Sequence, residues 1–580
     1  MMINQIIQYS LYLLILVVLA IPLGSYIGKV MNGEKTFLSK ILNPVENFIY
    51  KLVGIDKNEE MDWKKYAKAT IIFSILSFIV LFVLQMIQGL LPLNPEGIKG
   101  MSWHLSFNTA SSFVTNTNWQ SYSGEIQASY LTQMLGLTVQ NFVSAAVGIS
   151  VLFALIRGFT IVKGKTLGNF WVDATRSVVH ILMPLSIVVA LLIASQGVVQ
   201  NFSSYEEVNL LQPITLEDGT VVTKQVVPQG PAASQIAIKQ LGTNGGGFFG
   251  VNSAHPLENP TPFTNVVEML SILIIPAALC FTFGRNIKDK RQGRAIFIAM
   301  FLVLIVALAV IAVNEANATP QLVQNGAVDI STINQAGGNM EGKESRFGIA
   351  SSATWTAYTT AVSNGSVNSM LDSYTPLGGM IPMLLMQLGE VIFGGAGCGL
   401  YGMIAFAIIA VFMAGLMVGR TPEYLGKKIE PFEMKMAMLV CLATPIATLI
   451  GSGIASLVPS VLNSLNNSGA HGFSEMLYAY SSAGGNNGSA FAGFGANTPF
   501  INVSLGIIMI FVRFVPLVAT LAIAGSLVKK KKVAVSAGTL PTHDALFIGL
   551  LVFVVILVGA LSFFPALALG PIAEFFQMIG

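Results

Sequence analysis

The chain is dominated by long runs of apolar residues separated by shorter polar connections. A helix that crosses a membrane needs about 20 mostly apolar residues, and ten stretches of this kind follow one another along the chain. They lie at residues 6–27, 69–91, 131–156, 172–194, 266–283, 295–313, 381–418, 436–458, 501–527 and 546–568. The seventh is interrupted by a glycine-rich run at 394–399. The pattern predicts an all-α polytopic membrane protein with ten transmembrane helices, one of them broken.

Four connections between these stretches share a second pattern. Each contains an apolar stretch too short to cross the bilayer, followed at once by a cluster of Gly, Asn, Ser or Thr. The stretches and their clusters are 104–114 with 115–118, 234–241 with 242–247, 347–362 with 363–366, and 473–482 with 484–489. Irregular backbone at membrane depth is tolerated only where it is buried in protein or lines a watery path. We therefore expect four span, pore-loop, span repeats around a pseudo-fourfold axis.

The repeat divides the chain into six segments. Residues 1–67 hold an extra first helix, retained rather than cleaved, and a cytoplasmic loop, and residues 533–580 hold an extra last helix. The pore-loop repeats between them are 68–160, 161–290, 291–425 with the broken helix, and 426–532.

Two similar strings mark helix starts in the second and fourth repeats. They are ENPTPFTN at 258–265 and GANTPFIN at 495–502. A threonine can cap a helix, and the proline that follows suits its first turn. Both strings therefore predict that a helix begins at the proline.

Composition and charge agree with a membrane protein. The chain is 53% hydrophobic and 10% charged, with a mean hydropathy of +0.69. One alternating set of connections carries 25 Lys and Arg residues and the other carries 5. Because basic loops stay in the cytoplasm, we expect both termini outside. The basic residues are sorted by membrane side, so no nucleic-acid partner is expected.

The polar clusters have the composition of a cation filter. Rings of backbone carbonyls can replace the hydration shell of a monovalent cation, and glycine adopts the positive φ that aims them. Gly245 to Gly247, Gly365 and Gly488 are the candidates for this role. The residues expected to hold the loops by side-chain hydrogen bonds are Thr243, Asn244, Asn364, Asn486 and Asn487. The first cluster, 115–118, has no glycine, which predicts an asymmetric filter. Ordinary extracellular turns are the alternative.

Two charged residues interrupt apolar stretches. Charges inside spans are unfavourable and usually functional. Arg513 is interpreted as a fixed positive charge below the clusters, with a structural ion pair as the alternative. Glu390 precedes the 394–399 break, which is interpreted as a gate or as a helix-packing kink. Asp173 and Glu268 lie near the ends of spans and are expected at the membrane interface.

Several activities lack their sequence signals. The chain has no G-x-x-x-x-G-K-[ST] phosphate loop and no DKTGT phosphorylation sequence, so any ATP hydrolysis must occur on another chain. A membrane enzyme is disfavoured, because no embedded cluster of His, Asp and Glu appears among five histidines. The three cysteines have no metal-ligand spacing and are interpreted as small buried hydrophobes.

Several long strings carry a resemblance to a known family. They are VTNTNWQSYSGE at 114–125, GTNGGGFFG at 242–250, NMEGKESRFG at 339–348, GLMVGRTPEYLGKKIE at 415–430, NNGSAFAG at 486–493 and SAGTLPTH at 536–543. Together they closely resemble the KdpA family, the potassium-binding components of the bacterial Kdp ATPases, over essentially the whole chain. The resemblance implies a bacterial plasma-membrane protein of the superfamily of K⁺ transporters. It also implies partners, namely a P-type ATPase subunit (KdpB), KdpC and a small subunit, KdpF, with K⁺ as cargo and no organic cofactor.

The resemblance also assigns site residues. It places the K⁺ filter at Thr115, Asn116, Thr117, Asn118, Thr243, Asn244, Gly245, Gly246, Gly247, Ser363, Asn364, Gly365, Asn486, Asn487 and Gly488, with Gln120 in support. It places Glu390, Gly394, Gly395, Gly397, Gly399 and Arg513 below the filter, near a tunnel that leads sideways to the pump subunit. We expect the straight path to the cytoplasm to be blocked. A stand-alone Trk/Ktr-like transporter or channel, which shares the four-unit core, is the alternative.

Overall fold

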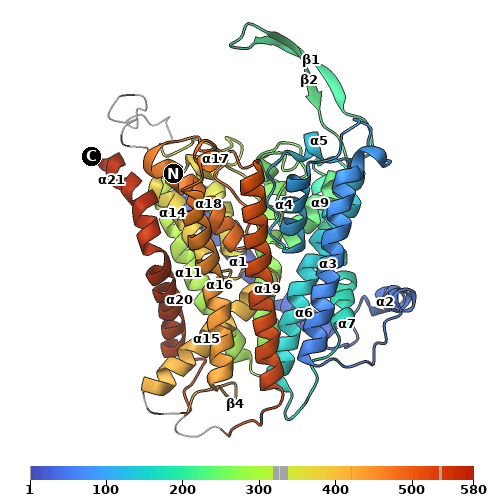
Figure 1. The fold of residues 1–580 in the computed structure, drawn as a ribbon, viewed down its shortest axis with the longest axis vertical. Coiled ribbons are helices and arrows are strands. Elements are labelled where there is room, and N and C mark those ends of the chain that lie inside the picture. The colour runs from blue at the N-terminus through green and yellow to red at the C-terminus, as the bar shows by residue number, and fades with distance from the viewer. Residues whose placement is uncertain are drawn as a thin grey trace.

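The computed structural model describes residues 2–317, 320, 326, 337–417, 419, 421–534 and 539–580. Residue 418, where the seventh predicted span ends, and residues 536–538 of the SAGTLPTH string lie outside the described residues. Among the described residues, ten helices are long and apolar enough to cross a membrane. They run side by side in one bundle, and both termini lie at the same end of it (Figure 1). The ten predicted spans are confirmed as helices of this kind.

Several spans join more than one helical element. α6 (Val139–Thr160) follows a π-helical turn, η2 (Thr132–Thr138). The fourth span joins α7 (Phe170–Arg176), η3 (Ser177–Leu182) and α8 (Met183–Ala194). The last joins α20 (Ala545–Leu567), η6 (Ala568–Ile572) and α21 (Ala573–Ile579). The others are α1 (Met2–Met31), α3 (Trp63–Ile87), α10 (Pro262–Asn286), α11 (Lys290–Ala316), α15 (Cys398–Met417), α16 (Pro431–Ala455) and α19 (Pro499–Leu527).

Four short helices stand where the sequence predicts re-entrant segments. They are α4 (Trp103–Val114), α9 (Ala232–Leu241), α13 (Gly348–Ala361) and α18 (Gly469–Gly484). All are too short to cross a bilayer, and α4, α9 and α18 lie in the half of the bundle nearer the termini (Figure 1). Each ends where its polar cluster begins. The four pore-loop repeats are therefore present, whereas the boundaries of the six segments stay a prediction.

The two repeated strings begin helices as predicted. α10 starts at Pro262 and α19 at Pro499, and the preceding threonines, Thr261 and Thr498, accept hydrogen bonds from backbone N–H groups in the first turn. These bonds satisfy donors that would otherwise lack a partner inside the helix. The strings therefore fix two helix starts in equivalent repeats.

The last residue of each string, an asparagine, ties neighbouring repeats together. Asn265 donates from Nδ2 to Ser351 Oγ of α13 at 2.5 Å. In the matching position, the Asn502 carbonyl accepts from Asn108 Nδ2 of α4 at 2.8 Å. Each asparagine thus reaches the re-entrant helix of the next repeat in the ring.

The seventh predicted span is broken, but earlier than the sequence indicates. α14 (Pro376–Gln387) and α15 (Cys398–Met417) are separated by residues 388–397, so the break is not at 394–399 and Gly399 already lies in a helix. Gly389, Glu390, Phe393 and Gly394 all have positive φ. Such a run cannot continue a right-handed helix. The glycines at 394–399 therefore mark only the second half of the break.

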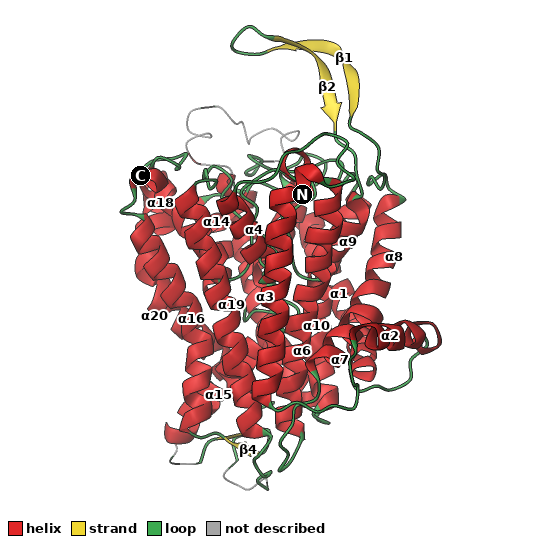
Figure 2. Ribbon diagram, turned by 45° about the vertical axis from the view of Figure 1, so that its right-hand side comes forward, coloured by secondary structure: helices red, strands yellow, loops and turns green. Residues whose placement is uncertain are grey.

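Two elements lie outside the bundle. The strands β1 (Glu206–Thr215) and β2 (Val221–Val227) pair antiparallel in a hairpin that projects from the end with the termini (Figure 1). The helix α2 (Ser39–Val53) lies nearly at right angles to the long helices (Figure 2). The smaller elements are η1 (Gln88–Leu90), α5 (Gly124–Gln127), η4 (Asn252–Ala254), η5 (Leu371–Ser373), β3 (Glu423–Tyr424), β4 (Lys427–Lys428) and α17 (Pro459–Leu462).

Candidate functional site

The four polar clusters share one backbone conformation. In each, two residues with positive φ flank a residue that is not left-handed. The flanking pairs are Asn116 and Asn118 (67° and 57°), Thr243 and Gly245 (53° and 80°), Ser363 and Gly365 (56° and 82°), and Asn486 and Gly488 (44° and 100°). In a strand successive carbonyls point to opposite sides, whereas alternation of the sign of φ turns them to the same side. The clusters therefore have the backbone that a carbonyl-lined filter needs.

The first cluster is less different from the others than the sequence predicts. Asn118 stands where the other clusters have glycine, yet it adopts the same left-handed conformation. Asparagine tolerates this region better than most residues, because its short polar side chain can hydrogen-bond locally. Its Nδ2 donates to Asn141 Oδ1 at 2.7 Å. The first cluster therefore does not differ from the others in this triplet, and the asymmetry lies in the side chains and in Gly246, whose φ of 67° has no counterpart in the other clusters.

The clusters close into a ring in which each contacts the next. A Cβ atom placed on Gly245 would lie 1.5 Å from the Asn364 carbonyl oxygen. A Cβ atom on Gly365 would lie 2.1 Å from the Asn487 oxygen, and one on Gly488 would lie 2.1 Å from the Thr117 oxygen. The order of contacts is second to third, third to fourth and fourth to first cluster.

Side chains of the first cluster complete the ring. Asn116 Nδ2 donates to the Thr243 carbonyl oxygen at 2.8 Å, and Asn118 Nδ2 lies 3.4 Å from the Gly245 carbonyl oxygen. The first cluster therefore contacts the second through amide groups rather than through a glycine. All four loops that the sequence singles out are brought together.

Side-chain hydrogen bonds hold the loops, as predicted. Asn244 Nδ2 donates to Asn116 Oδ1 at 2.5 Å, and Asn486 Nδ2 donates to Thr117 Oγ1 at 2.9 Å. Asn364 Nδ2 donates to the carbonyl of Lys239 in α9 at 3.1 Å, and Asn487 Nδ2 donates to that of Thr359 in α13 at 2.8 Å. In each case the acceptor lies in the re-entrant helix of the preceding repeat. Asn364 and Asn487 also accept at Oδ1 from the backbone N–H and hydroxyl of the serine two residues on. The clusters are thus fixed rather than free turns.

Gln120, which follows the first loop, contacts the second loop. Its Oε1 accepts from the Gly247 N–H at 2.7 Å, and its Nε2 donates to the Gly247 carbonyl at 3.1 Å. A bidentate amide of this kind fixes both position and orientation. Gln120 therefore anchors the second loop to the chain that follows the first.

A buried ion pair beneath the second loop was not predicted from the sequence. Lys239 pairs with Glu258, and both side chains are at most 1% exposed. Lys239 Nζ donates to the Gly246 carbonyl at 2.9 Å, and Glu258 Oε1 accepts from the N–H groups of Phe248 and Phe249 at 2.5 and 3.0 Å. The pair therefore holds the glycine-rich loop through three backbone groups, the Gly246 carbonyl and the N–H groups of Phe248 and Phe249. The sequence contains one signal of this ion pair, namely a lysine inside the semi-apolar stretch 234–241.

Asp173 and Glu268, expected at the membrane interface, are both buried within the protein. Asp173 is buried and forms a two-pronged ion pair with Arg157, with N–O distances of 2.5 and 2.7 Å. Glu268 is fully buried and accepts from Gln240 Nε2 at 2.9 Å. Burial with compensating donors explains how both carboxyls are accommodated.

A wide vestibule lies at one face of the ring. Its volume is about 820 Å³. Residues of three clusters line it, together with the supporting glutamine; they are Asn118, Gly246, Gly488 and Gln120. Lys343 and Phe494 contribute to its wall. The ring is thus open to a space large enough for a hydrated ion.

A buried polar group occupies the other face of the ring. Arg513 donates to Cys398 Sγ at 2.7 Å, and its Nη1 lies 3.8 Å from Glu390 Oε2. Arg513 is only 4% exposed. A cavity of about 20 Å³, lined by Arg513, Glu390 and Asn486 of the fourth cluster, connects this group to the ring. Arg513 thus lies within ion-pair distance of Glu390, as in the structural alternative, and its role as a fixed charge below the clusters stays a prediction.

The broken segment lies directly against two of the loops. The Ala396 N–H donates to Thr243 Oγ1 at 2.8 Å, and the Gly394 N–H donates to the Ala361 carbonyl at the end of α13 at 3.0 Å. A Cβ atom on Gly397 would lie 2.3 Å from the Gly148 carbonyl oxygen, and one on Gly399 would lie 1.8 Å from that of Phe393. Gly395 faces Glu390 and Thr243. The glycines therefore let the break pack tightly beneath the ring.

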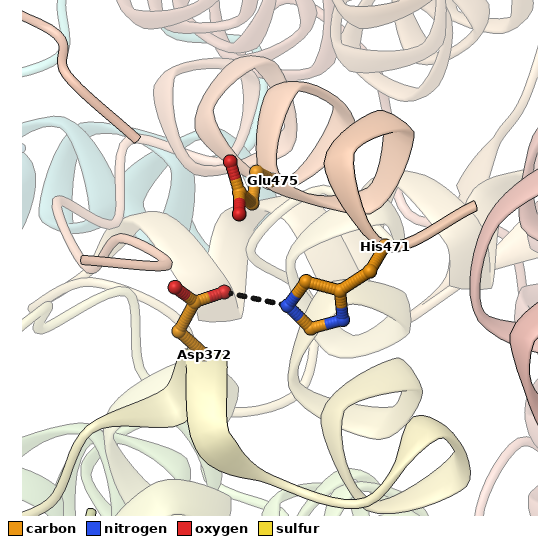
Figure 3. A group of neighbouring side chains, drawn as sticks. All are labelled: Asp372, His471 and Glu475. Carbon is orange, nitrogen blue, oxygen red and sulfur yellow. Dashed lines mark hydrogen bonds and ion pairs between the residues drawn. The ribbon is translucent and has the colours of Figure 1, made fainter. Parts of the chain in front are cut away.

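A histidine clasp joins the third and fourth repeats to the last helix. His471 of α18 faces Asp372 Oδ1 through Nε2 at 2.9 Å and Glu574 Oε1 through Nδ1 at 2.8 Å. Figure 3 shows the His471 ring directed toward Asp372, with Glu475 nearby. Glu475 instead accepts from the backbone N–H groups of Asn466 and Asn467. Asp372, His471 and Glu475 have the donor types of a metal site, but an imidazolium between two carboxylates already satisfies both ring nitrogens.

The clasp predicts a pH-dependent stability. Burial alone would lower the pKa of His471, but hydrogen bonds to Asp372 and Glu574 outweigh it and raise the pKa to about 10. The contribution of the clasp to the free energy of unfolding is fully present below pH 6.5 and is lost as the pH rises through 10. The shift corresponds to at most about 5 kcal/mol, reduced because the ring is 21% exposed. We expect the melting temperature to fall across this window in the natural chain and to stay flat in His471→Asn. His543→Gln is the control and should behave like the natural chain. An equal slope of melting temperature against pH in the natural chain and in His471→Asn would contradict the clasp.

Ten candidate spans and four re-entrant loops closing one ring define the chain as a polytopic pore-loop transport protein. The fold is similar to that of the potassium transporter TrkH from Vibrio parahaemolyticus, with a TM-score of 0.50 and 12% identity over 87% of this chain and 95% of that one. Residues 10–576 match the family model described as KdpA, Potassium-transporting ATPase A subunit, and the chain belongs to this family.

Two relatives show how far the similarity extends. Proteins named "Potassium-transporting ATPase potassium-binding subunit" from Clostridium botulinum and Clostridium perfringens are each 76% identical. The first match spans 100% of both chains, and the second spans 99% of this chain and 100% of the relative. The TrkH likeness concerns the fold alone and does not favour a stand-alone transporter.

Proposed function

We propose that the chain is the potassium-binding and potassium-translocating subunit of an ATP-driven K⁺ uptake complex. The observation that carries the proposal is the ring of four loops with one alternating backbone, set between an outer vestibule and a buried arginine. Carbonyls turned to one side by alternating φ can replace the water around K⁺ at fixed distances. The printed names of the relatives, which are potassium-binding subunits, agree with this chemistry.

The filter is proposed to consist of the twelve residues of the flanked triplets, with Thr115, Gly246 and Gly247 beside them. Each of the four loops is braced by a side chain of its neighbour or of the preceding helix, so the oxygen positions are set before the ion arrives. Such preorganisation lets the site discriminate between ions. A small rigid ring disfavours Na⁺ because its shorter ion–oxygen distances cannot be met by all loops at once.

Below the ring, the ion is proposed to turn sideways. The break between α14 and α15 packs against the second and third loops, and the glycines there leave little room for a straight path. Arg513 places a guanidinium next to the cavity under the fourth loop, where it repels a cation that continues toward Cys398. Glu390 is the group that partly offsets this charge. These features support delivery of K⁺ through the membrane to a partner chain.

The energy for uptake is proposed to come from a partner. We assign ATP hydrolysis to a P-type ATPase subunit, KdpB, with KdpC and the single-helix KdpF as further members of the complex. The asymmetry of basic residues supports an orientation in which both termini, and with them the β1–β2 hairpin, lie outside the cell. The vestibule then faces the medium from which K⁺ is taken.

The proposal is tested on the assembled complex. We expect a complex purified through a tag on this chain to contain a partner ATPase and to hydrolyse ATP in response to K⁺ at concentrations at which Na⁺ has no effect. The measurement is phosphate release during titrations of K⁺, Rb⁺ and Na⁺ in choline chloride. A chain that purifies without an ATPase and conducts K⁺ unaided in liposomes would overturn it.

A further inference from the structure

The helix α2 carries an exposed apolar face that no other described element covers. Ile41, Val45, Phe48 and Leu52 are 69%, 41%, 64% and 73% exposed. Their spacing of four, three and four residues places them on one side of the helix. The opposite side is turned toward the bundle, where Glu46 and Tyr50 are buried. An apolar stripe of this length in contact with water is unfavourable, so something covers it.

A set of buried contacts fixes the level of α2 along the bundle. Glu46 accepts from Arg176 Nε at 3.0 Å and from Tyr50 OH at 2.6 Å, and its Oε2 lies 2.8 Å from His180 Nε2. Burial alone would raise the pKa of Glu46, but the hydrogen bonds from His180, Tyr50 and Arg176 lower it to about 2. The carboxylate therefore stays charged, and α2 stays docked.

The docking point lies close to one end of a span. Arg176 and His180 belong to the first ten or so residues of the fourth span, Phe170–Ala194. At 1.5 Å per residue, they lie within roughly 15 Å of its end. Arg176, the seventh residue of the span, lies about 9 Å from its end, which is near the boundary between headgroups and a hydrocarbon core about 30 Å thick, whereas His180 lies deeper. α2 lies across the spans at this level, toward the end opposite the hairpin (Figure 2).

The apolar surface continues from α2 onto the span that holds it. Ile187 and Leu191 of α8, farther along the same span, are 55% and 67% exposed. Apolar side chains exposed on a membrane span are the ones expected to face the hydrocarbon of the bilayer. Continuity with a lipid-facing surface identifies lipid as the occupant of the stripe, in preference to a protein partner.

Two lysines lie beside the stripe, on the same side of it. Lys40 and Lys51 are exposed and are eleven residues apart, which is three helical turns, so they share one side of α2. That side adjoins the stripe next to Phe48. Lysines beside an apolar face lie at headgroup level and attract anionic lipids.

We propose that α2 is an interfacial helix that binds anionic phospholipids of the leaflet opposite the hairpin. The stripe inserts among acyl chains, and Lys40 and Lys51 bind headgroup phosphates. This role is separate from ion selection, because α2 does not touch the ring. It gives the chain a second ligand class, the anionic membrane surface itself.

Depth is tested with spin labels on the full chain within its complex in nanodiscs. The three natural cysteines are buried, so a label reacts with an introduced one. We expect a nitroxide at Phe48→Cys to collide more with oxygen than with a water-soluble nickel chelate, and a label at the neighbouring Asn47→Cys to show the reverse. Equal access of the chelate to both positions would overturn the proposal. Shielding of position 48 from both reagents would also overturn it, because a protein would then be the occupant.

Lipid preference is tested with a fluorophore at the same Phe48→Cys. We expect brominated phosphatidylglycerol to quench it more than brominated phosphatidylcholine at equal mole fraction. Lys40→Gln/Lys51→Gln should reduce this preference by a factor of up to about five per lysine, and high salt should act in the same direction. Lys99→Gln/Lys224→Gln, on connections at the hairpin end, is the matched control and should leave it unchanged. No preference in the natural chain, or no loss in the Lys40/Lys51 variant, would refute anionic lipid binding.

Discussion

Replacement of Gly245 by alanine is expected to lower the apparent K⁺ affinity of the complex by about a hundredfold. Gly245 has a φ of +80°, and an added Cβ would lie 1.5 Å from the Asn364 oxygen and 2.5 Å from the Ser366 nitrogen. A left-handed alanine costs about 1–2 kcal/mol, and both close atoms are backbone, so the third loop must move. A loss of about 3 kcal/mol of ion coordination corresponds to roughly two decades in affinity.

The measurement is K⁺-stimulated ATP hydrolysis across a K⁺ titration, with Na⁺ and Rb⁺ run in parallel. Gly549→Ala in α20 is the matched control, because no heavy atom lies within 4 Å of its added Cβ and its backbone is helical. It should leave the titration unchanged. If Gly245→Ala assembles normally and titrates like the natural chain, the four clusters are turns and the proposed filter is wrong.

Much of the architecture could be predicted because it follows from local pattern. A span requires a fixed length of apolar sequence, and a re-entrant helix is recognised by being too short, so both are read from consecutive residues. Helix starts at Pro262 and Pro499 were predictable for the same reason, since the cap and the proline are adjacent. The clusters could be identified because glycine and asparagine are enriched where φ is positive.

The remaining features depend on residues that are far apart in the chain. Arg513 and Glu390 were identified separately, but nothing local shows that their side chains approach to 3.8 Å. The early start of the break was missed because Glu390 and Phe393 adopt positive φ, which their types do not favour. The left-handed backbone of Asn118 was missed because the side-chain hydrogen bond that supports it is made to Asn141, 23 residues further along the chain.

The β1–β2 hairpin was also missed, for a different reason. Its strands flank the turn Glu217-Asp218-Gly219, and an Asp-Gly pair between β-rich runs is a hairpin signal. That signal is short beside the long apolar runs that dominate the chain. The hairpin is exposed along its length, so burial did not leave an alternating pattern in its sequence.

The second large effect is expected at the buried pair of Lys239 and Glu258. Glu258→Gln keeps an oxygen for the N–H groups of Phe248 and Phe249 but removes the charge opposite Lys239. The ammonium group would then remain buried without its ion-pair partner, which is destabilising by about 3–5 kcal/mol. We expect a marked fall in the melting temperature of the complex and a weaker response to K⁺, because Lys239 also holds the Gly246 carbonyl of the proposed filter loop.

The double variant Lys239→Met/Glu258→Gln separates the charge from the packing. With both charges removed, no buried ion lacks a partner, so the double variant should be more stable than Glu258→Gln alone. Thermal unfolding of the four members of this cycle measures the coupling. Lys224→Met, which removes half of the exposed Lys224–Glu207 pair on the hairpin, should leave the melting temperature unchanged. If the double variant is instead as unstable as the sum of the two single variants, Lys239 and Glu258 act independently. The glycine-rich loop would then be held by its own hydrogen bonds and not by the ion pair.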